Sequence, residues 1–510
     1  MKKFLILILS IITIAGSSCK KDFLNLDKNP NIPPTATNDV LLASSLRNTA
    51  DIVNGGLNNY YTQYACWMGY ASWSTGFQPN SQLESYIFTE SDYDVWTPLY
   101  LNISNYSALK KQNSGANFIA IANIMIAYDF QALVDNYNNV PYSDAIQGRA
   151  NLTPKYDKGS DIYDHLMKQL DSSIVLIQGA PKTDPLPVSG DIMFNGNMTS
   201  WIKLANTLKL KLAIRQSNLA VKAGALKTAV SATQALGYID ATNSAEVNPG
   251  YTNLDASGGQ QSPVWLAYGF NQSGGGQNGN QTYQANSYAV NFFYSNFDTI
   301  RANTLYLVPD SGRVRGTPFG QTTPPSDAGG NPLAVSKFGS GILKSAAMNS
   351  KVLSASESLF LQAEGVASGL ISGNASALYN AGITAAFEDI LSDPKLSSPL
   401  ATSQADALAL KYYSQGSIAY PSGGTLETQK KAIIVQKWAA LDLYGAFEAF
   451  NEFRRTGYPD NIPLSITPGA NAPNQVTRIF YPFVEKSTNS INLKLEATVD
   501  IFKSKIFWAK

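Results

Sequence analysis

Apolar residues recur every three to four positions through most of the chain, which is the spacing of one face of an α-helix. The stretch 117–136 shows it most clearly, with Phe118, Ile121 and Met125 on one face. The same spacing predicts further helices at roughly 38–54, 57–70, 93–111, 160–178, 199–219, 221–235, 352–370, 374–391, 404–414 and 425–455. The sequence therefore predicts a mainly α-helical fold.

The helices follow one another in pairs, which suggests stacked helix–turn–helix units of the tetratricopeptide kind. From 237 to 345 the periodicity gives way to Gly, Asn, Gln, Ser, Tyr and Pro. A long segment of this kind inside a globular protein usually has a function. We therefore expect one α-rich body, residues 37–510, in which tetratricopeptide-like helix pairs form a scaffold for a large loop-rich, irregular insertion at about 237–345.

The N-terminus has the three regions of a secretory signal. Lys2 and Lys3 precede an apolar stretch, Phe4–Ala15, and small residues then lead to Cys19. The apolar stretch is shorter than the ~20 residues that cross a bilayer, so it predicts a signal peptide over 1–18. A cysteine directly after the small residues indicates a bacterial lipoprotein, with Cys19 lipidated and 19–36 as a tether. The alternative is an ordinary signal peptide.

The charge balance excludes some classes of partner. Lys and Arg total 38 against 37 Asp and Glu, so the chain is nearly neutral and has no field suited to nucleic acid. Charged residues make up only 15% of the chain. Because neutral polar and aromatic residues are plentiful instead, such a surface suits neutral ligands such as sugars.

Cysteine and histidine are too scarce for much metal or nucleophilic chemistry. With Cys19 lipidated, Cys66 has no disulfide partner and is expected to be a small buried hydrophobe. The single histidine, His165, lies in an amphipathic helix, where a structural role is favoured. A zinc site needs several such ligands, and no Gly-x-Ser-x-Gly elbow, nucleotide loop or EF-hand pattern is present. We expect no cofactor and no metal.

A series of motifs in a fixed order resembles the SusD/RagB family. The motifs are Asn117–Gln131 with Asp135–Ser143, Leu152–Asp157 with Ile162–Tyr163, Trp201–Arg215, Ser358–Glu364, Gln436–Asp442, Phe453–Arg455 and Arg478–Pro482 with Glu485 and Asn492. Together they span nearly the whole chain after the signal. The resemblance implies an α-helical, lipid-anchored outer-membrane protein with tetratricopeptide-like units, displayed at the cell surface. It further implies that the protein captures oligosaccharides, or peptides in some members, for a SusC-like TonB-dependent β-barrel transporter, and performs no chemistry.

Two of these motifs have a structural interpretation from the residues themselves. Trp201, Leu204, Leu208 and Leu212 form one helical stripe and are expected in the core. Lys203, Lys209, Lys211 and Arg215 form a basic face, either solvated or paired. The end of the 425–455 helix gathers Glu448, Glu452, Arg454 and Arg455, which predicts a helix-stabilising ion-pair cluster.

Ligand binding is expected in loops rich in aromatic and amide side chains, because aromatic faces stack on pyranose rings and amides pair with vicinal hydroxyls. The candidates from the first loop are Trp73, Phe77 and Trp96. Those from the insertion are Trp265, Tyr268, Phe270, Asn271, Gln281 and Tyr283. For any one of these aromatics, packing in the core is the competing interpretation.

Two other functions remain open. A glycan-cleaving enzyme needs two carboxylates across the scissile bond, and the loop acids that could supply them are Glu84, Glu90, Asp92, Asp94, Asp255 and Asp298. No spacing singles out a pair. The third possibility is a helical scaffold that binds only protein.

Overall fold

The computed structural model describes residues 36–53, 59–74, 81–112, 114–254, 260–310, 312–321, 323 and 334–510. The chain divides into two units, Met1–Thr37 and Asn38–Lys510, and the second unit carries the fold. The predicted signal peptide, Cys19 and nearly all of the predicted tether lie outside the described residues.

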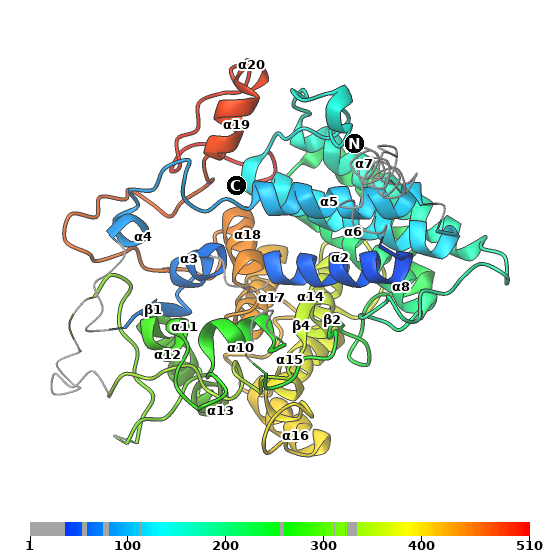
Figure 1. Cartoon of the computed structure of the whole chain (residues 1–510). Coiled ribbons are helices and arrows are strands. Elements are labelled where there is room, and N and C mark those ends of the chain that lie inside the picture. The colour runs from blue at the N-terminus through cyan, green and yellow to red at the C-terminus, as the bar shows by residue number, and fades with distance from the viewer. Residues whose placement is uncertain are drawn as a thin grey trace, which may run out of the picture. The chain divides into compact units, whose positions relative to one another are not determined.

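The second unit is built mainly from helices that pack on their neighbours in sequence (Figure 1). Its first half contains α2 (Asn38–Val53), α3 (Asn59–Trp67), α4 (Ser81–Ser85), α5 (Trp96–Lys111), α6 (Ala116–Tyr137), α7 (Gly159–Gln178), α8 (Met198–Arg215) and α9 (Ala223–Ser231). Helix α5 packs on α6, α6 on α7 and α7 on α8, so each helix packs on the next along the chain. This stacking confirms the predicted mainly α fold with tetratricopeptide-like pairs.

The second half repeats the arrangement. It contains α14 (Ala355–Ala367), α15 (Ala375–Leu391), α16 (Thr402–Tyr413), α17 (Leu426–Leu441) and α18 (Ala446–Thr456), followed by the short α19 (Phe483–Thr488) and α20 (Ser490–Leu493). Helix α14 packs on α15 and α17, and it also contacts α8. The two halves therefore share one core.

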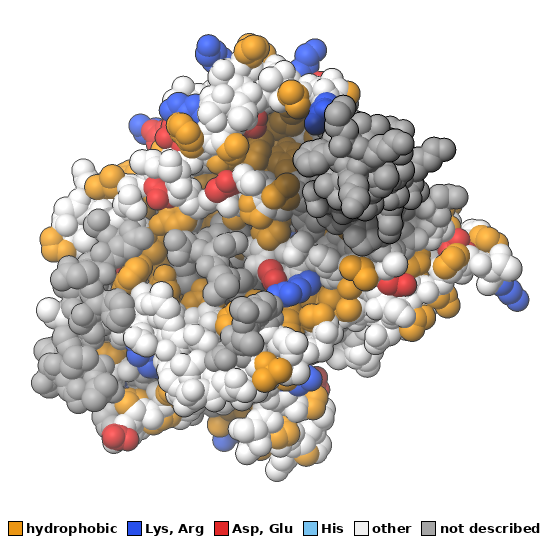
Figure 2. All heavy atoms as spheres, viewed as in Figure 1, with side chains coloured by type: hydrophobic (Ala, Val, Ile, Leu, Met, Phe, Trp, Pro, Cys, Tyr) orange, Lys and Arg blue, Asp and Glu red, His pale blue; other side chains and the backbone are white. Residues whose placement is uncertain are grey.

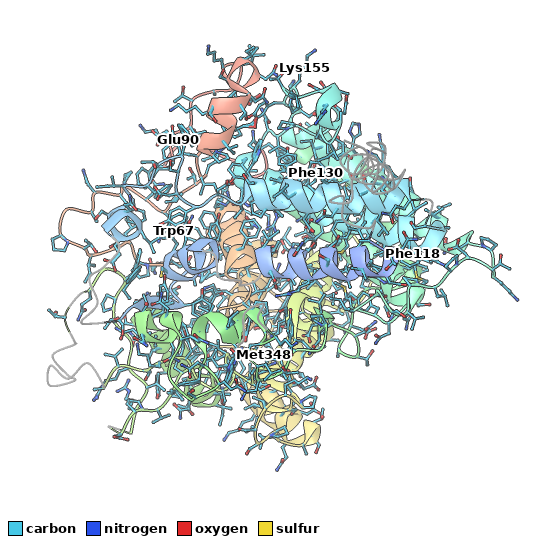
Figure 3. All side chains as sticks on the ribbon, viewed as in Figure 1. Trp67, Glu90, Phe118, Phe130, Lys155 and Met348 are labelled. Carbon is cyan, nitrogen blue, oxygen red and sulfur yellow. The ribbon has the colours of Figure 1, made fainter. Side chains whose placement is uncertain are left out.

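Helix α6 is long and apolar enough to cross a membrane, and it is the only such helix in the described part of the chain. However, 89% of its most apolar stretch is buried inside the protein. Phe118, near its start, and Phe130, in its second half, are both buried (Figure 3). We conclude that α6 is the central core helix of the first half.

The prediction of one continuous helix over 425–455 is wrong. Helix α17 ends at Leu441, and α18 begins at Ala446. Asp442 has a φ of +43°, a left-handed backbone conformation that a helix cannot continue through. The break turns α18 back onto α17 and α3, so charged side chains on either side of the turn face each other.

The insertion contains more regular structure than its composition suggests. Its helices are α10 (Pro263–Tyr268), α11 (Asn278–Thr282), α12 (Ser287–Ser295) and α13 (Thr299–Leu305), and its strands are β2 (Ala245–Val247) and β3 (Tyr283–Ala285). Strand β1 (Ala71–Trp73) pairs antiparallel with β3, and β2 pairs antiparallel with β4 (Ser350–Leu353). Through these two-stranded sheets, the start and the middle of the insertion each pair with a strand outside it.

The basic residues of α8 are paired rather than solvated. Lys211 contacts Glu357 at 2.8 Å and Glu448 at 2.9 Å, and Arg215 contacts Glu448 at 2.6 Å. Lys437 bridges Glu448 and Glu452 at 2.9 Å each, while Arg455 makes a two-point contact with Glu364 at 2.8 and 2.7 Å. All of these side chains are buried. This central ion network therefore joins α8, α14, α17 and α18.

The lysine and arginine side chains of the network keep its glutamates ionised. Burial alone would raise the pKa of Glu448, yet Arg215, Lys211 and Lys437 hold that pKa well below its ordinary value. The predicted ion-pair cluster at the end of α18 is confirmed within the helix by the contact between Arg455 and Glu452, at 2.5 Å. Its other partners lie on separate helices, so the network stabilises tertiary packing more than α18 itself.

Other predicted core positions are confirmed. Trp201, Leu204, Leu208 and Leu212 are buried. Cys66 is buried as well, and burial raises the pKa of its thiol well above the ordinary value, which makes it unreactive. The ring of His165 stacks on Tyr142 with centroids 5.8 Å apart, a structural contact at the surface.

Candidate functional site

The pairing of β1 with β3 brings together aromatic residues from distant parts of the sequence. Trp73 lies opposite Tyr283 in the antiparallel register. Side chains at paired positions point to the same face of a sheet, and their ring centroids are 5.3 Å apart. Trp73 is half-buried, so part of the indole is accessible to a ligand.

Helix α10 adds a second layer of rings. Tyr268 packs on Tyr283 with centroids 6.1 Å apart and on Phe338 at 6.1 Å. Tyr268 and Tyr283 are only 4% and 8% exposed. A Cβ at Gly279 would lie 2.4 Å from the Tyr268 ring, so only glycine allows α11 to approach so closely. These two tyrosines are therefore too buried to contact a ligand widely, and they support the more accessible rings beside them.

Trp265 and Phe270 form another ring pair, on α10 and the turn that follows it. Their centroids are 5.9 Å apart, and Trp265 Nε1 donates to the Phe270 carbonyl oxygen at 2.9 Å. Asn271 closes the adjoining hairpin, because its side-chain oxygen accepts from the backbone N–H groups of Ser273 at 3.0 Å and Gly275 at 2.8 Å. Both rings are half-buried and fixed in orientation.

Lys337 lies beside these rings and was not predicted from the sequence. Its Nζ donates to Ser74 Oγ at 2.6 Å and to the carbonyl oxygens of Gln281 at 3.0 Å and Tyr283 at 3.2 Å. All three partners are neutral, and burial lowers the pKa of Lys337 to about 8. Lys337 therefore links the end of β1 to α11 and β3. No local sequence signal indicates this role, because the three partners come from two distant segments.

Ring contacts thus link Trp73, Tyr283 and Tyr268, and α10, which carries Trp265 and Tyr268, packs on α11 beside β3. We define the aromatic face by its members Trp73, Trp265, Tyr268, Phe270, Asn271, Gln281 and Tyr283. Gln281 is exposed at its edge, where its Nε2 donates to the Gly276 carbonyl oxygen at 3.0 Å. The face combines stacking surfaces with amide groups, as a sugar-binding surface requires.

Two predicted residues are not part of this surface as described. Trp96 opens α5, is 6% exposed and packs in a separate cluster of rings from Tyr100, Tyr137, Tyr156 and Tyr481. Its surroundings are those of a core residue, because helices and loops cover it on several sides. Phe77 lies outside the described residues.

The candidate acids of a glycan-cleaving site are engaged in local contacts. Asp298 pairs with Arg301 in the core, and Glu84 accepts from Thr467 at 3.1 Å. Glu90 pairs with Lys486 beside α19 at 3.0 Å (Figure 3).

The remaining described acids accept hydrogen bonds from nearby backbone N–H groups. Asp92 accepts from the Thr89 N–H at 2.8 Å and Asp94 from the Thr97 N–H at 3.0 Å, while Asp255 is not among the described residues. Among the described residues there is also no group of three or more His, Cys, Asp or Glu that could hold a metal ion.

Comparison with known proteins agrees with the fold. Residues 30–482 match the SusD-like family described as "starch-binding associating with outer membrane". A solved chitin-binding protein is 24% identical, with a TM-score of 0.70 over 92% of this chain and 99% of its own. A chitin-binding SusD homologue from Flavobacterium johnsoniae is 21% identical, with a TM-score of 0.69 over 92% and 98% of the two chains.

A SusD homologue from Bacteroides fragilis is 19% identical, with a TM-score of 0.72 over 93% of this chain and 99% of its own. No curated protein sequence matched. The family match covers most of the sequence, and the solved homologues share the helical scaffold. The chain belongs to the SusD-like family of outer-membrane-associated glycan-binding proteins.

Proposed function

We propose that this protein captures neutral oligosaccharides on the aromatic face. The proposal rests on three half-buried rings, Trp73, Trp265 and Phe270, in segments that the Tyr283–Tyr268 ring contact links, and on the exposed amide of Gln281. Two of the similar solved proteins are described as chitin-binding, which supports a glycan as the ligand class. Members of the family bind ligands rather than transform them, so we propose that bound sugar leaves unchanged.

Alanine substitutions on the face test the proposal. Trp73→Ala and Trp265→Ala should each weaken binding of chitohexaose or maltohexaose by about tenfold or more, which corresponds to ~1.4 kcal/mol of lost binding energy. Phe483→Ala is the matched control, because Phe483 is an exposed aromatic residue on α19 outside the face. Isothermal titration calorimetry provides the affinities. Wild-type affinity in both tryptophan variants would show that the ligand binds elsewhere.

The same preparations test for catalysis. Chromatography of each hexasaccharide after prolonged incubation should recover it intact. Appearance of shorter fragments with wild-type protein, and not with a boiled sample, would instead establish a glycan-cleaving enzyme.

We further propose that the protein is anchored to the outer membrane through lipidated Cys19 and passes its ligand to a SusC-like TonB-dependent barrel. The family's association with the outer membrane and the signal-like residues before Cys19 support this. The test is a pull-down of the tagged protein from its own membranes in mild detergent, with Cys19→Ser as the control. Recovery of a barrel protein in near-equal amount is expected, and its absence from lipidated wild-type material would refute the partnership.

A further inference from the structure

A second concave site lies in the helical scaffold, away from the aromatic face in sequence. A cavity of about 460 Å³ opens between the 3₁₀ turn Gln234–Leu236, the following Tyr238, and the turn that joins α14 to α15. This volume is within the ~300–1,000 Å³ range of small-ligand pockets. None of the residues of the aromatic face lines it.

The walls of the cavity are held in place by hydrogen bonds within the protein. The side chain of Gln234 donates to the Ser372 carbonyl oxygen at 2.6 Å and accepts from the Ser372 N–H at 3.0 Å. This two-point contact joins the turn after α9 to the turn before α15. Asn374 fixes the other rim, because its side-chain oxygen accepts from the Ala377 N–H at 3.1 Å and caps α15. The cavity is therefore formed before any ligand arrives.

The chemistry of the lining is that of a neutral sugar site. None of the described residues that line the cavity carries a charged side chain. Gln362 contributes an amide oxygen and the exposed Ser372 a hydroxyl, while Ile371, Leu378 and the ring of Tyr238, whose own hydroxyl is buried, form an apolar wall. Amide and hydroxyl groups beside an apolar surface match the hydroxyls and apolar face of a pyranose, whereas an anion or cation would find no opposite charge.

We infer that this scaffold cavity is a second binding site for a neutral saccharide unit, independent of the aromatic face. The inference rests on the proposed function for the class of ligand and on the cavity for the location. Two sites on one protein would hold a long glycan at two points. Such bivalent contact raises the apparent affinity for chains long enough to reach both sites.

The test introduces a bulky side chain into the cavity at a residue that is exposed to solvent. Ala377 is exposed on α15 and lines the cavity, so Ala377→Trp should block it without disturbing the core. Ala407→Trp is the matched control, because Ala407 is an exposed alanine on α16 that does not line the cavity. Thermal unfolding confirms that each variant is folded.

Titration calorimetry with chitohexaose and maltohexaose then counts sites on the full chain. Wild type and Ala407→Trp should bind at two sites, Ala377→Trp should lose one of them by at least about tenfold, and Trp265→Ala should lose the other.

The outcomes separate this inference from the proposed function. If Ala377→Trp binds like wild type while Trp265→Ala loses all binding, the scaffold site is refuted and the aromatic face stands. If Ala377→Trp abolishes binding and Trp265→Ala does not, the scaffold site stands and the aromatic face is refuted. If neither hexasaccharide binds wild type, both proposals are overturned.

Discussion

Asp129 is a fully buried carboxylate in the middle of α6 whose hydrogen-bond partners are neutral. Thr49 Oγ donates to one carboxylate oxygen at 3.1 Å, and Asn102 Nδ2 donates to the other at 2.9 Å. Burial raises the pKa of Asp129 from 3.8 to about 7, although these two hydrogen bonds lower it in part. The folded protein therefore keeps this residue protonated well above the pH at which the unfolded chain ionises it.

This difference makes stability depend on pH. Between about pH 4 and pH 7 the folded state binds a proton that the unfolded state has released, so the free energy of unfolding falls as the pH rises. One pKa unit corresponds to ~1.4 kcal/mol. A shift of about three units therefore costs on the order of 4 kcal/mol between pH 4 and pH 8.

Asp129→Asn should remove this cost without disturbing the packing. The new amide oxygen can accept from Asn102, and its NH₂ group can donate to Thr49 Oγ. The Thr49 hydroxyl then donates to Tyr106 Oη, which lies 3.1 Å away. We expect the variant to match wild type near pH 4 and to be more stable by ~2–4 kcal/mol at pH 8. Urea unfolding at half-unit pH intervals measures the difference.

Asp389 is a carboxylate whose pKa is lowered instead of raised, so Asp389→Asn should have the opposite effect on stability. Burial would raise the pKa of Asp389, but Lys344 at 2.8 Å and Lys351 at 2.5 Å hold it far below the ordinary value. This substitution should therefore destabilise the protein at neutral pH and matter less in acid. If Asp129→Asn and wild type instead lose stability in parallel from pH 4 to pH 8, Asp129 is ionised throughout and the reasoning is wrong.

Three further substitutions probe the ion network, the support of the aromatic face and a tight turn. Arg455→Met leaves Glu364 buried without its partner and should lower the free energy of unfolding by about 3–5 kcal/mol in urea titrations. Lys337→Met should abolish the rise in stability that a lowered lysine pKa predicts as the pH increases from about 8 to 10, measured by thermal unfolding. Gly69→Ala should cost at least ~1–2 kcal/mol, because Gly69 has a φ of +75° and a Cβ there would lie 2.7 Å from the Tyr288 ring.

Each of these has its own check. The double variant Arg455→Met with Glu364→Leu should recover part of the lost stability, and no recovery would mean that packing rather than charge was lost. Gly416→Ala is the control for the turn, since nothing lies within 4 Å of its Cβ position. Equal stability of the two alanine variants would contradict the steric argument. A wild-type alkaline profile in Lys337→Met would show that Lys337 titrates normally.

Local pattern predicted the scaffold well because amphipathic periodicity is a local property. The stripe from Trp201 to Leu212 shows which face of α8 is buried, and the structure agrees. The break at Asp442 was missed, because single residues of low helix propensity such as Asp442 and Gly445 are tolerated inside an otherwise periodic helical pattern. Whether Lys211 and Arg215 are solvated or paired also could not be decided, because their partners lie on α14 and α18.

The aromatic face was only partly predictable for the same reason. Trp73 and Trp96 look equivalent in the sequence, each an aromatic residue in a loop-rich segment. They differ in what packs on them: Tyr137 and Tyr481 cover Trp96, whereas Trp73 pairs with Tyr283 at the end of a short strand. These contacts join distant residues, so composition could indicate the region and not the individual residue.

The central ion network also affects how the protein meets its ligand. Only 15% of the chain is charged, and the charged side chains of the network are buried, where they neutralise one another. The visible surface is accordingly dominated by uncharged side chains, with few Lys, Arg, Asp and Glu (Figure 2). A surface of this kind exerts little long-range pull on a neutral glycan, so encounter depends on diffusion alone. The proposed capture of glycan should then proceed at the same rate in dilute medium and in concentrated salt.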